Sequence, residues 1–135
     1  MFKKIMVPLD GSLLSEAALP QAIDLAKHYD AEIELVIISL IPTLYHVIDE
    51  SVLKLDTESC RMYIERAAGI VRDAGVRVST HVGEGAPAVA RTIVRRADAW
   101  GADLIVLSSH GQGSVERLVL GSVAERVAHM ARVPV

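Results

Sequence analysis

The chain has 135 residues, half of them hydrophobic (51%), and a chain of this length buries about two-thirds of its unfolded surface in one core. Its formal net charge of −3 and pI of about 5.9 provide no basic field, so we expect no binding to nucleic acid or to an anionic membrane. The single cysteine, Cys60, has no partner for an internal disulfide, which favours an inert thiol in a reducing cytoplasm.

The amino-terminal half begins with a strand at Lys4–Pro8. A turn at residues 10–12 then leads into a helix that reaches about Tyr29, and Pro20 is expected to kink its first turns. The next strand is Glu32–Leu40, and the order of the chain from there to about Ser51 is unclear. The apolar stretch at the start is too short for a secretory signal, and no run reaches transmembrane length.

The middle of the chain is predicted to hold a long helix, an edge strand and a second helix. The long helix runs to Asp73 or Ala74, where Gly75 is expected to end it in the left-handed conformation. The remaining predictions are an edge strand at Val76–Val82, a turn at Gly83 and Gly85, and a helix from Pro87 to near Trp100 and Gly101.

The carboxyl-terminal part contains a short apolar run at Leu104–Leu107, which is typical of a central parallel strand covered on both faces. The last helix is predicted from Ser122 to about Ala131, with Val123, Val127 and Met130 buried. Residues Val133–Val135 look like the start of another strand that is cut short. Strands and helices therefore alternate, which indicates an α/β fold with a parallel sheet, and no repeat or linker divides residues 1–135 into more than one domain.

The most informative segment follows the Leu104–Leu107 run. Residues 108–114 supply hydroxyls, exposed amides and two glycines, as a loop around an anion requires. Gly121 and Ser122 are then expected to open the last helix, and a helix start attracts phosphate through its unpaired N–H groups and its dipole. The segment predicts a phosphate site.

Three loops are expected to meet beyond the carboxyl ends of the strands, where open α/β sheets bind ligands. They are residues 8–12, 40–43 and 108–122. Asp10 suits a ribose hydroxyl or an adenine amine, and the backbone near Leu40 suits the edge of a base. Together with the phosphate loop, these features indicate a nucleotide pocket. Asp10 could equally shape its turn, and Ser122 could equally cap its helix.

At these residues the chain resembles the universal stress protein family over nearly all its length. Nucleotide-binding members carry G-x-x-G-x(9)-G-[ST]. Here Gly111, Gly121 and Ser122 match the pattern, and Ser108 stands where it has its first glycine. The segments VPLDGS and GSVAERV also look like family signatures.

The resemblance implies a Rossmann-like (HUP-type) open parallel sheet of order 3-2-1-4-5 with helices on both faces and the last strand truncated. It also implies a homodimer through that strand and an adenine nucleotide, ATP, ADP or AMP, with magnesium left open. Seven implied binding residues are matched by position, and we add Ser108 to them: Pro8, Asp10, Leu40, Ser108, Gly111, Gly121, Ser122 and Val123.

The leading hypothesis is a cytoplasmic, nucleotide-responsive, dimeric stress-response regulator. The glycine loop lacks the G-K-[ST] lysine, so any ATP hydrolysis is expected to be slow. Neighbouring Ser109 and His110 have no identifiable group to orient them as a catalytic pair, and no metal-ligand spacing is present. An adenylyl transferase would need an H-x-G-H element, which is absent. The alternative is a stress protein that binds no nucleotide and acts only through protein contacts.

Overall fold

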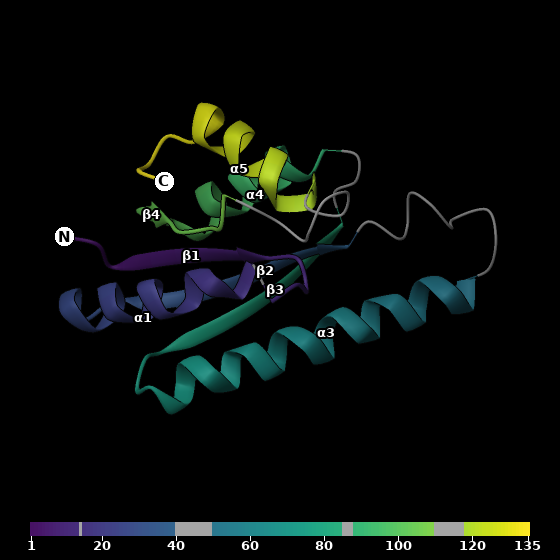
Figure 1. Cartoon of the computed structure of the whole chain (residues 1–135), viewed down its shortest axis with the longest axis horizontal. Coiled ribbons are helices and arrows are strands. Elements are labelled where there is room, and N and C mark those ends of the chain that lie inside the picture. Colours follow the sequence, from purple (N-terminus) through teal and green to yellow (C-terminus); the bar gives the residue numbers. More distant parts are fainter. Residues whose placement is uncertain (14, 40–49, 85–87, 110–117) are drawn as a thin grey trace.

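The computed structural model of the chain describes residues 1–13, 15–39, 50–84, 88–109 and 118–135, which form an α/β fold (Figure 1). The described strands are parallel and lie in the order β3-β2-β1-β4, which matches the first four places of the predicted order. The elements in chain order are β1 (Lys4–Leu9), the 3-10 helix η1 (Ser15–Ala17), α1 (Ala18–Tyr29), β2 (Glu32–Ser39), α3 (Glu50–Asp73), β3 (Val78–Glu84), α4 (Val89–Trp100), β4 (Leu104–Ile105) and α5 (Leu118–Met130).

Helices cover both faces of the sheet, with α1 and α3 on one side and α4 and α5 on the other (Figure 1). The pleat of β1 explains the division, because successive side chains on a strand point to opposite faces. Ile5 and Val7 pack with α1 and α3, whereas Met6 between them packs with α4 and α5. All three are fully buried, so β1 is covered on both faces, as is typical of a continuous apolar run in a parallel sheet.

The strand β3 lies at one edge of the described sheet, as predicted, although it begins two residues later than expected. The prediction that Gly83 forms a turn is wrong. Gly83 is buried within β3 and pairs with Ile38 of β2, and a β-carbon there would approach Cδ1 of Ile38 to 3.0 Å. The close approach of the Ile38 side chain, and not a turn, therefore explains why this position holds a glycine. Gly85 and Pro87 lie outside the described residues.

Two glycines end helices as the sequence predicts. Gly75 follows α3 with φ of +87°, and Gly101 follows α4 with φ of +86°. A residue with a β-carbon is strained at these angles, so both helices stop where the sequence supplies glycine.

The first helix differs from the prediction at its start. The chain forms the 3-10 helix η1 before α1 begins at Ala18, so Pro20 is the third residue of α1. A proline is tolerated there because the first N–H groups of a helix have no partner within it. Pro20 thus belongs to the first turn of α1. Instead of a kink within one longer helix, the chain changes from the 3-10 helix η1 to the α-helix α1 just before Pro20.

The last helix corrects two predictions. The α5 helix begins at Leu118, so Gly121 and Ser122 lie within its first five residues and do not open it. Leucine and valine at residues 118–120 extend the helix upstream, and a glycine inside a helix costs only about 1 kcal/mol. Val123 and Val127 are buried as expected, but Met130 is 41% exposed because it lies on the last turn.

The β4 strand is hydrogen-bonded on both sides. The N–H of Val106 donates to the carbonyl of Met6 over 2.9 Å, and the N–H of Ile105 donates to the carbonyl of Pro134 over 3.0 Å. Residues 133–135, where the sequence predicts the start of a further strand, form no strand in the structure, and Pro134 contributes this one hydrogen bond to β4. No helix in the described part of the chain is long and apolar enough to cross a membrane.

Candidate functional site

The described site residues lie at two neighbouring strand ends. Pro8 is buried in β1, Asp10 follows β1 directly, and Ser108 follows β4, the parallel neighbour of β1. The carboxyl ends of parallel neighbours meet at the same edge of a sheet, so the structure brings Asp10 and Ser108 to one edge. Leu40 and Gly111 lie outside the described residues.

The turn that carries Asp10 is held by its own side chains. The backbone N–H of Ser12 donates to Oδ1 of Asp10 over 2.8 Å, which closes an Asx turn. Gly11 between them has φ of +89°, a conformation that favours glycine. The Asp10-Gly11 pair therefore shapes its turn, as one reading of the sequence expected, and this role occupies only one carboxylate oxygen.

Ser15 closes the same turn from η1. Its side chain is fully buried, accepts the N–H of Asp10 over 3.3 Å and donates to the carbonyl of Ser12 over 2.9 Å. The N–H of Ser15 also donates to Oγ of Ser12 over 3.1 Å. These bonds fix the backbone from Asp10 to Ser15 as one unit.

The second carboxylate oxygen of Asp10 is the unusual feature of the site. Oδ2 is buried, and it has no hydrogen-bond partner among the described residues. A buried oxygen without a donor is costly, and native proteins seldom leave one unpaired. Asp10 therefore has one oxygen that structures the turn and one that remains available to a hydrogen-bond donor from a ligand. A nucleotide offers such donors as hydroxyl and amine groups, so Asp10 fits the expected ligand.

Tyr63 and Glu16 adjoin this turn and were not predicted. The Tyr63 hydroxyl on α3 donates to Oε2 of Glu16 on η1 over 2.7 Å. Burial raises the pKa of Tyr63 well above its usual value of 10.0, and Glu16 raises it further through its hydrogen bond and its negative charge. A hydrogen bond with Ser15 opposes this rise, and the Asp10 charge adds to it. The tyrosine is 47 residues from Glu16, and no local pattern signals the contact.

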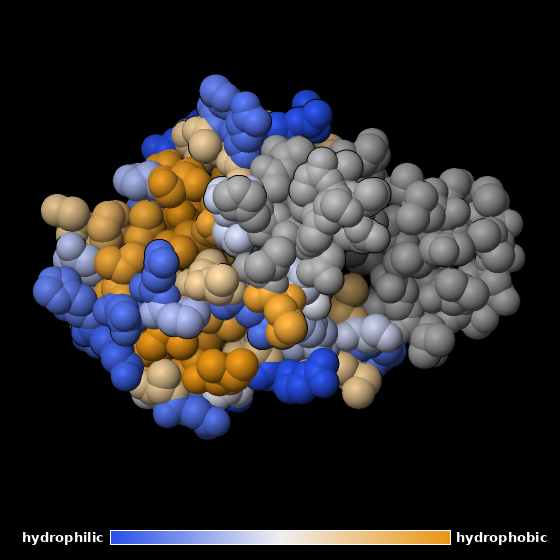
Figure 2. Space-filling model, viewed as in Figure 1, coloured by the Kyte–Doolittle hydropathy of each residue, from blue (hydrophilic) through white to orange (hydrophobic). Residues whose placement is uncertain are grey.

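Two hollows lie around the end of β4. One, of about 270 Å³, lies between the start of α1 and β4, with Ser108 and Ser109 in its wall. A larger one, of about 700 Å³, lies along the β4 segment between α1 and α5. Figure 2 shows hydrophobic residues gathered on this part of the surface, near the carboxyl terminus. The smaller hollow is the more polar of the two and includes one predicted site residue.

The remaining predicted residues lie on α5. In a helix that begins at Leu118, Ser122 is the fifth residue, so its N–H lies past the unpaired N–H groups of the first turn. Val123 is buried in the core on the α4 and α5 face. Any ligand contact of Val123 is therefore left to its backbone. Among the described residues no three histidine, cysteine or acidic side chains gather in a way that could hold a metal ion.

Comparison with known proteins identifies the group to which this arrangement belongs. The model of the universal stress protein family matches residues 1–135. A universal stress protein of Methanocaldococcus jannaschii is 35% identical over 139 residues, which cover all of this chain and 81% of that protein.

Solved structures agree in fold. A universal stress protein family member from Burkholderia pseudomallei has a TM-score of 0.75 and 29% identity, covering 98% of this chain and 92% of that one. A family protein from Arabidopsis thaliana, solved with AMP bound, has a TM-score of 0.70 over 98% of this chain and 88% of that one. Its 18% identity supports the likeness in fold alone.

Proposed function

Because the chain belongs to the universal stress protein family, we propose that it is an adenine-nucleotide-binding stress-response regulator that holds ATP, ADP or AMP at the carboxyl edge of its sheet. The observation that carries the proposal is the buried Oδ2 of Asp10, which has no hydrogen-bond partner within the described part of the chain. The AMP-bound family structure supports it, because that ligand is held on the same fold.

Each proposed residue has a role set by its chemistry. Asp10 accepts a hydrogen bond from a ribose hydroxyl or the adenine amine, and Pro8 and the backbone of Leu40 adjoin the nucleoside. The phosphates lie along the loop after β4 and the start of α5, where backbone N–H groups favour an anion. The residues proposed for that half of the ligand are Ser108, Gly111 and Gly121, together with Ser122 and Val123, which lie past the unpaired N–H groups of α5.

The protein is proposed to be a binder first. The glycine loop carries no lysine of the G-K-[ST] type, so hydrolysis of ATP is slow if it occurs, and magnesium is an optional companion of the phosphates. We propose a cytoplasmic homodimer whose shape or pairing responds to the nucleotide. Regulation of this kind requires the two dimer states to differ in their affinity for it.

A second candidate function is that of a stress protein with the same fold that binds no nucleotide. Ser108 places a β-carbon where the nucleotide-binding members of the family have glycine, and this favours a protein that acts through protein contacts alone. The two candidates differ in whether any adenine nucleotide binds.

The test is a calorimetric titration of the purified protein with ATP and magnesium, after mass spectrometry and the absorbance ratio have excluded nucleotide carried through purification. We expect saturable binding that is lost in Gly121→Trp, because a bulky side chain would fill the phosphate end. An absence of both binding and co-purified nucleotide would contradict the proposal and favour the second candidate.

A further inference from the structure

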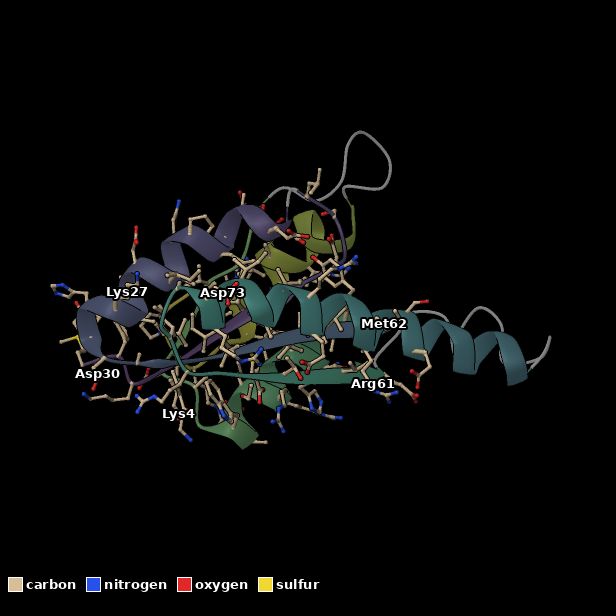
Figure 3. The ribbon with its side chains drawn as sticks, turned by 90° about the horizontal axis from the view of Figure 1, so that it is seen from below. Lys4, Lys27, Asp30, Arg61, Met62 and Asp73 are labelled. Carbon is tan, nitrogen blue, oxygen red and sulfur yellow. The ribbon has the colours of Figure 1, made fainter. Side chains whose placement is uncertain are left out.

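The α3 helix contacts the 3-10 helix that follows the Asp10 turn through the side chain of Tyr63. Tyr63, half-buried on α3, donates its hydroxyl to Oε2 of Glu16 over 2.7 Å. Figure 3 shows α3 crossing the same face of the sheet as α1, with Met62, the neighbour of Tyr63, labelled. The bond therefore connects the long helix to η1, which the chain forms between β1 and α1.

Glu16 transmits this contact to Asp10 through its neighbour. Ser15 immediately precedes Glu16 in η1, and its hydroxyl accepts the N–H of Asp10 over 3.3 Å. The N–H of Glu16 also donates to the carbonyl of Ser12 over 3.4 Å. Because Ser12 in turn binds Oδ1 of Asp10, a displacement of η1 changes the hydrogen bonds of both Asp10 and Ser12.

The Tyr63–Glu16 bond lies beside a hollow between the turn and α3. This hollow, of about 340 Å³, is lined by Gly11, Leu13, Arg66, Ala67 and Ile70 together with the tyrosine and its partner. Burial keeps the Tyr63 hydroxyl protonated well into alkaline pH, so it remains a donor. Loss of this donor would leave the half-buried Glu16 carboxylate without the hydrogen bond that ties η1 to α3.

We infer that Tyr63 is a positioning residue of the proposed nucleotide site, which holds the β1–α1 turn through Glu16 so that Oδ2 of Asp10 faces the ligand. The expected effect of Tyr63 on nucleotide affinity rests on the proposed function. Its hold on the turn is a property of the ligand-free protein and is tested separately. Occupancy of the site is coupled to α3 through the same bond.

The affinity test compares four variants by calorimetric titration with ATP and magnesium. Tyr63→Phe and Glu16→Ala each remove the bond and are expected to weaken binding roughly three- to tenfold, the effect of one hydrogen bond. Glu16→Gln keeps an acceptor for the tyrosine and is expected to stay within about twofold of the original protein.

Thr80→Val is the matched control. The Thr80 hydroxyl donates to Oε1 of Glu65 over 3.2 Å, so this variant also removes one hydrogen bond of α3, but at β3. Its nucleotide affinity is expected to be unchanged. An equal loss of affinity in Thr80→Val and Tyr63→Phe would show that Tyr63 only stabilises α3 in general and would overturn the inference. A Tyr63→Phe affinity equal to that of the original protein would also overturn it.

Hydrogen exchange of the ligand-free protein separates this inference from the proposed function. Faster exchange is expected at the amides of Asp10, Ser12 and Ser15 in Tyr63→Phe but not in Thr80→Val. If the original protein binds no nucleotide, the proposed function fails, and the exchange rates alone decide whether Tyr63 holds the turn. Unchanged exchange at the three amides would overturn the inference.

Discussion

The guanidinium of Arg96 on α4 forms two hydrogen bonds with the carboxylate of Glu34 on β2, with Nε to Oε1 at 2.8 Å and Nη2 to Oε2 at 2.6 Å. The Glu34 side chain is 2% exposed and that of Arg96 is 30% exposed. The pair therefore ties the helix to the inner part of the sheet, on the face away from α1 and α3.

Loss of the arginine is predicted to destabilise the fold. Arg96→Ala leaves the Glu34 carboxylate buried without its cation, and we expect the free energy of unfolding in urea to fall by about 3 kcal/mol. Arg95→Ala on the exposed side of α4 is the control, with an expected change below about 0.5 kcal/mol. Equal effects of the two variants would contradict this assignment.

Stability is predicted to fall in mild acid because of His81. Burial lowers the pKa of His81 below its usual 6.5, and the Arg96 charge lowers it further, while Glu34 opposes the shift. The unfolded chain therefore binds a proton at a higher pH than the folded chain, so the free energy of unfolding falls as the pH drops from 6.5 towards the folded pKa.

The comparison of His81→Gln with the original protein isolates this effect. We expect the variant to lose less stability between pH of about 7.5 and about 5 in urea unfolding, because glutamine does not titrate. An identical loss in both proteins would show that other groups carry the acid sensitivity.

Tyr63 is predicted to make the fold sensitive to alkali. Its raised pKa, caused first by burial and then by Glu16, means that above the usual value of 10.0 the unfolded chain loses a proton that the folded chain keeps. Stability therefore declines as the pH rises through that value. Urea unfolding of Tyr63→Phe at pH of about 9 and about 11 should show a smaller decline than the original protein, and an equal decline would refute the effect.

Two glycine substitutions are predicted to act in opposite directions. Gly83→Ala brings a β-carbon to 3.0 Å from Ile38 and is expected to destabilise the fold by about 1 kcal/mol. Gly69→Ala, inside α3 with open space around the added carbon, is expected to stabilise it by about 1 kcal/mol. Thermal unfolding of both variants measures the signs, and a stabilising Gly83→Ala would show that the Ile38 side chain moves aside.

The sequence predicts best those features that depend on neighbouring residues. The apolar runs of β1 and β2 and the glycine after α3 are local signals, and the structure confirms them. Gly83 was misread because its constraint comes from Ile38 on another strand. The start of α5 was misplaced because Gly121 resembles a helix boundary, whereas Leu118 extends the helix past it.

The candidate site divides in the same way. Asp10 after a buried strand is visible in the sequence, and its place at the carboxyl edge follows from the parallel sheet. The contacts of Tyr63 with Glu16 and of Arg96 with Glu34 join residues 47 and 62 positions apart. Contacts between residues so far apart in the sequence arise from the packing of helices on the sheet, and no periodic pattern in the sequence predicts them.

The most direct test of nucleotide binding at Asp10 is a calorimetric titration of the original protein and Asp10→Asn with ATP and magnesium. Asparagine keeps the oxygen that accepts the Ser12 N–H and replaces Oδ2, which has no partner in the part of the chain that the structure describes, with an amide nitrogen. We predict saturable binding by the original protein and at least about tenfold weaker binding by the variant, as expected for a hydrogen bond to a charged group. Equal affinity of the two proteins, or no binding by either, would contradict the account.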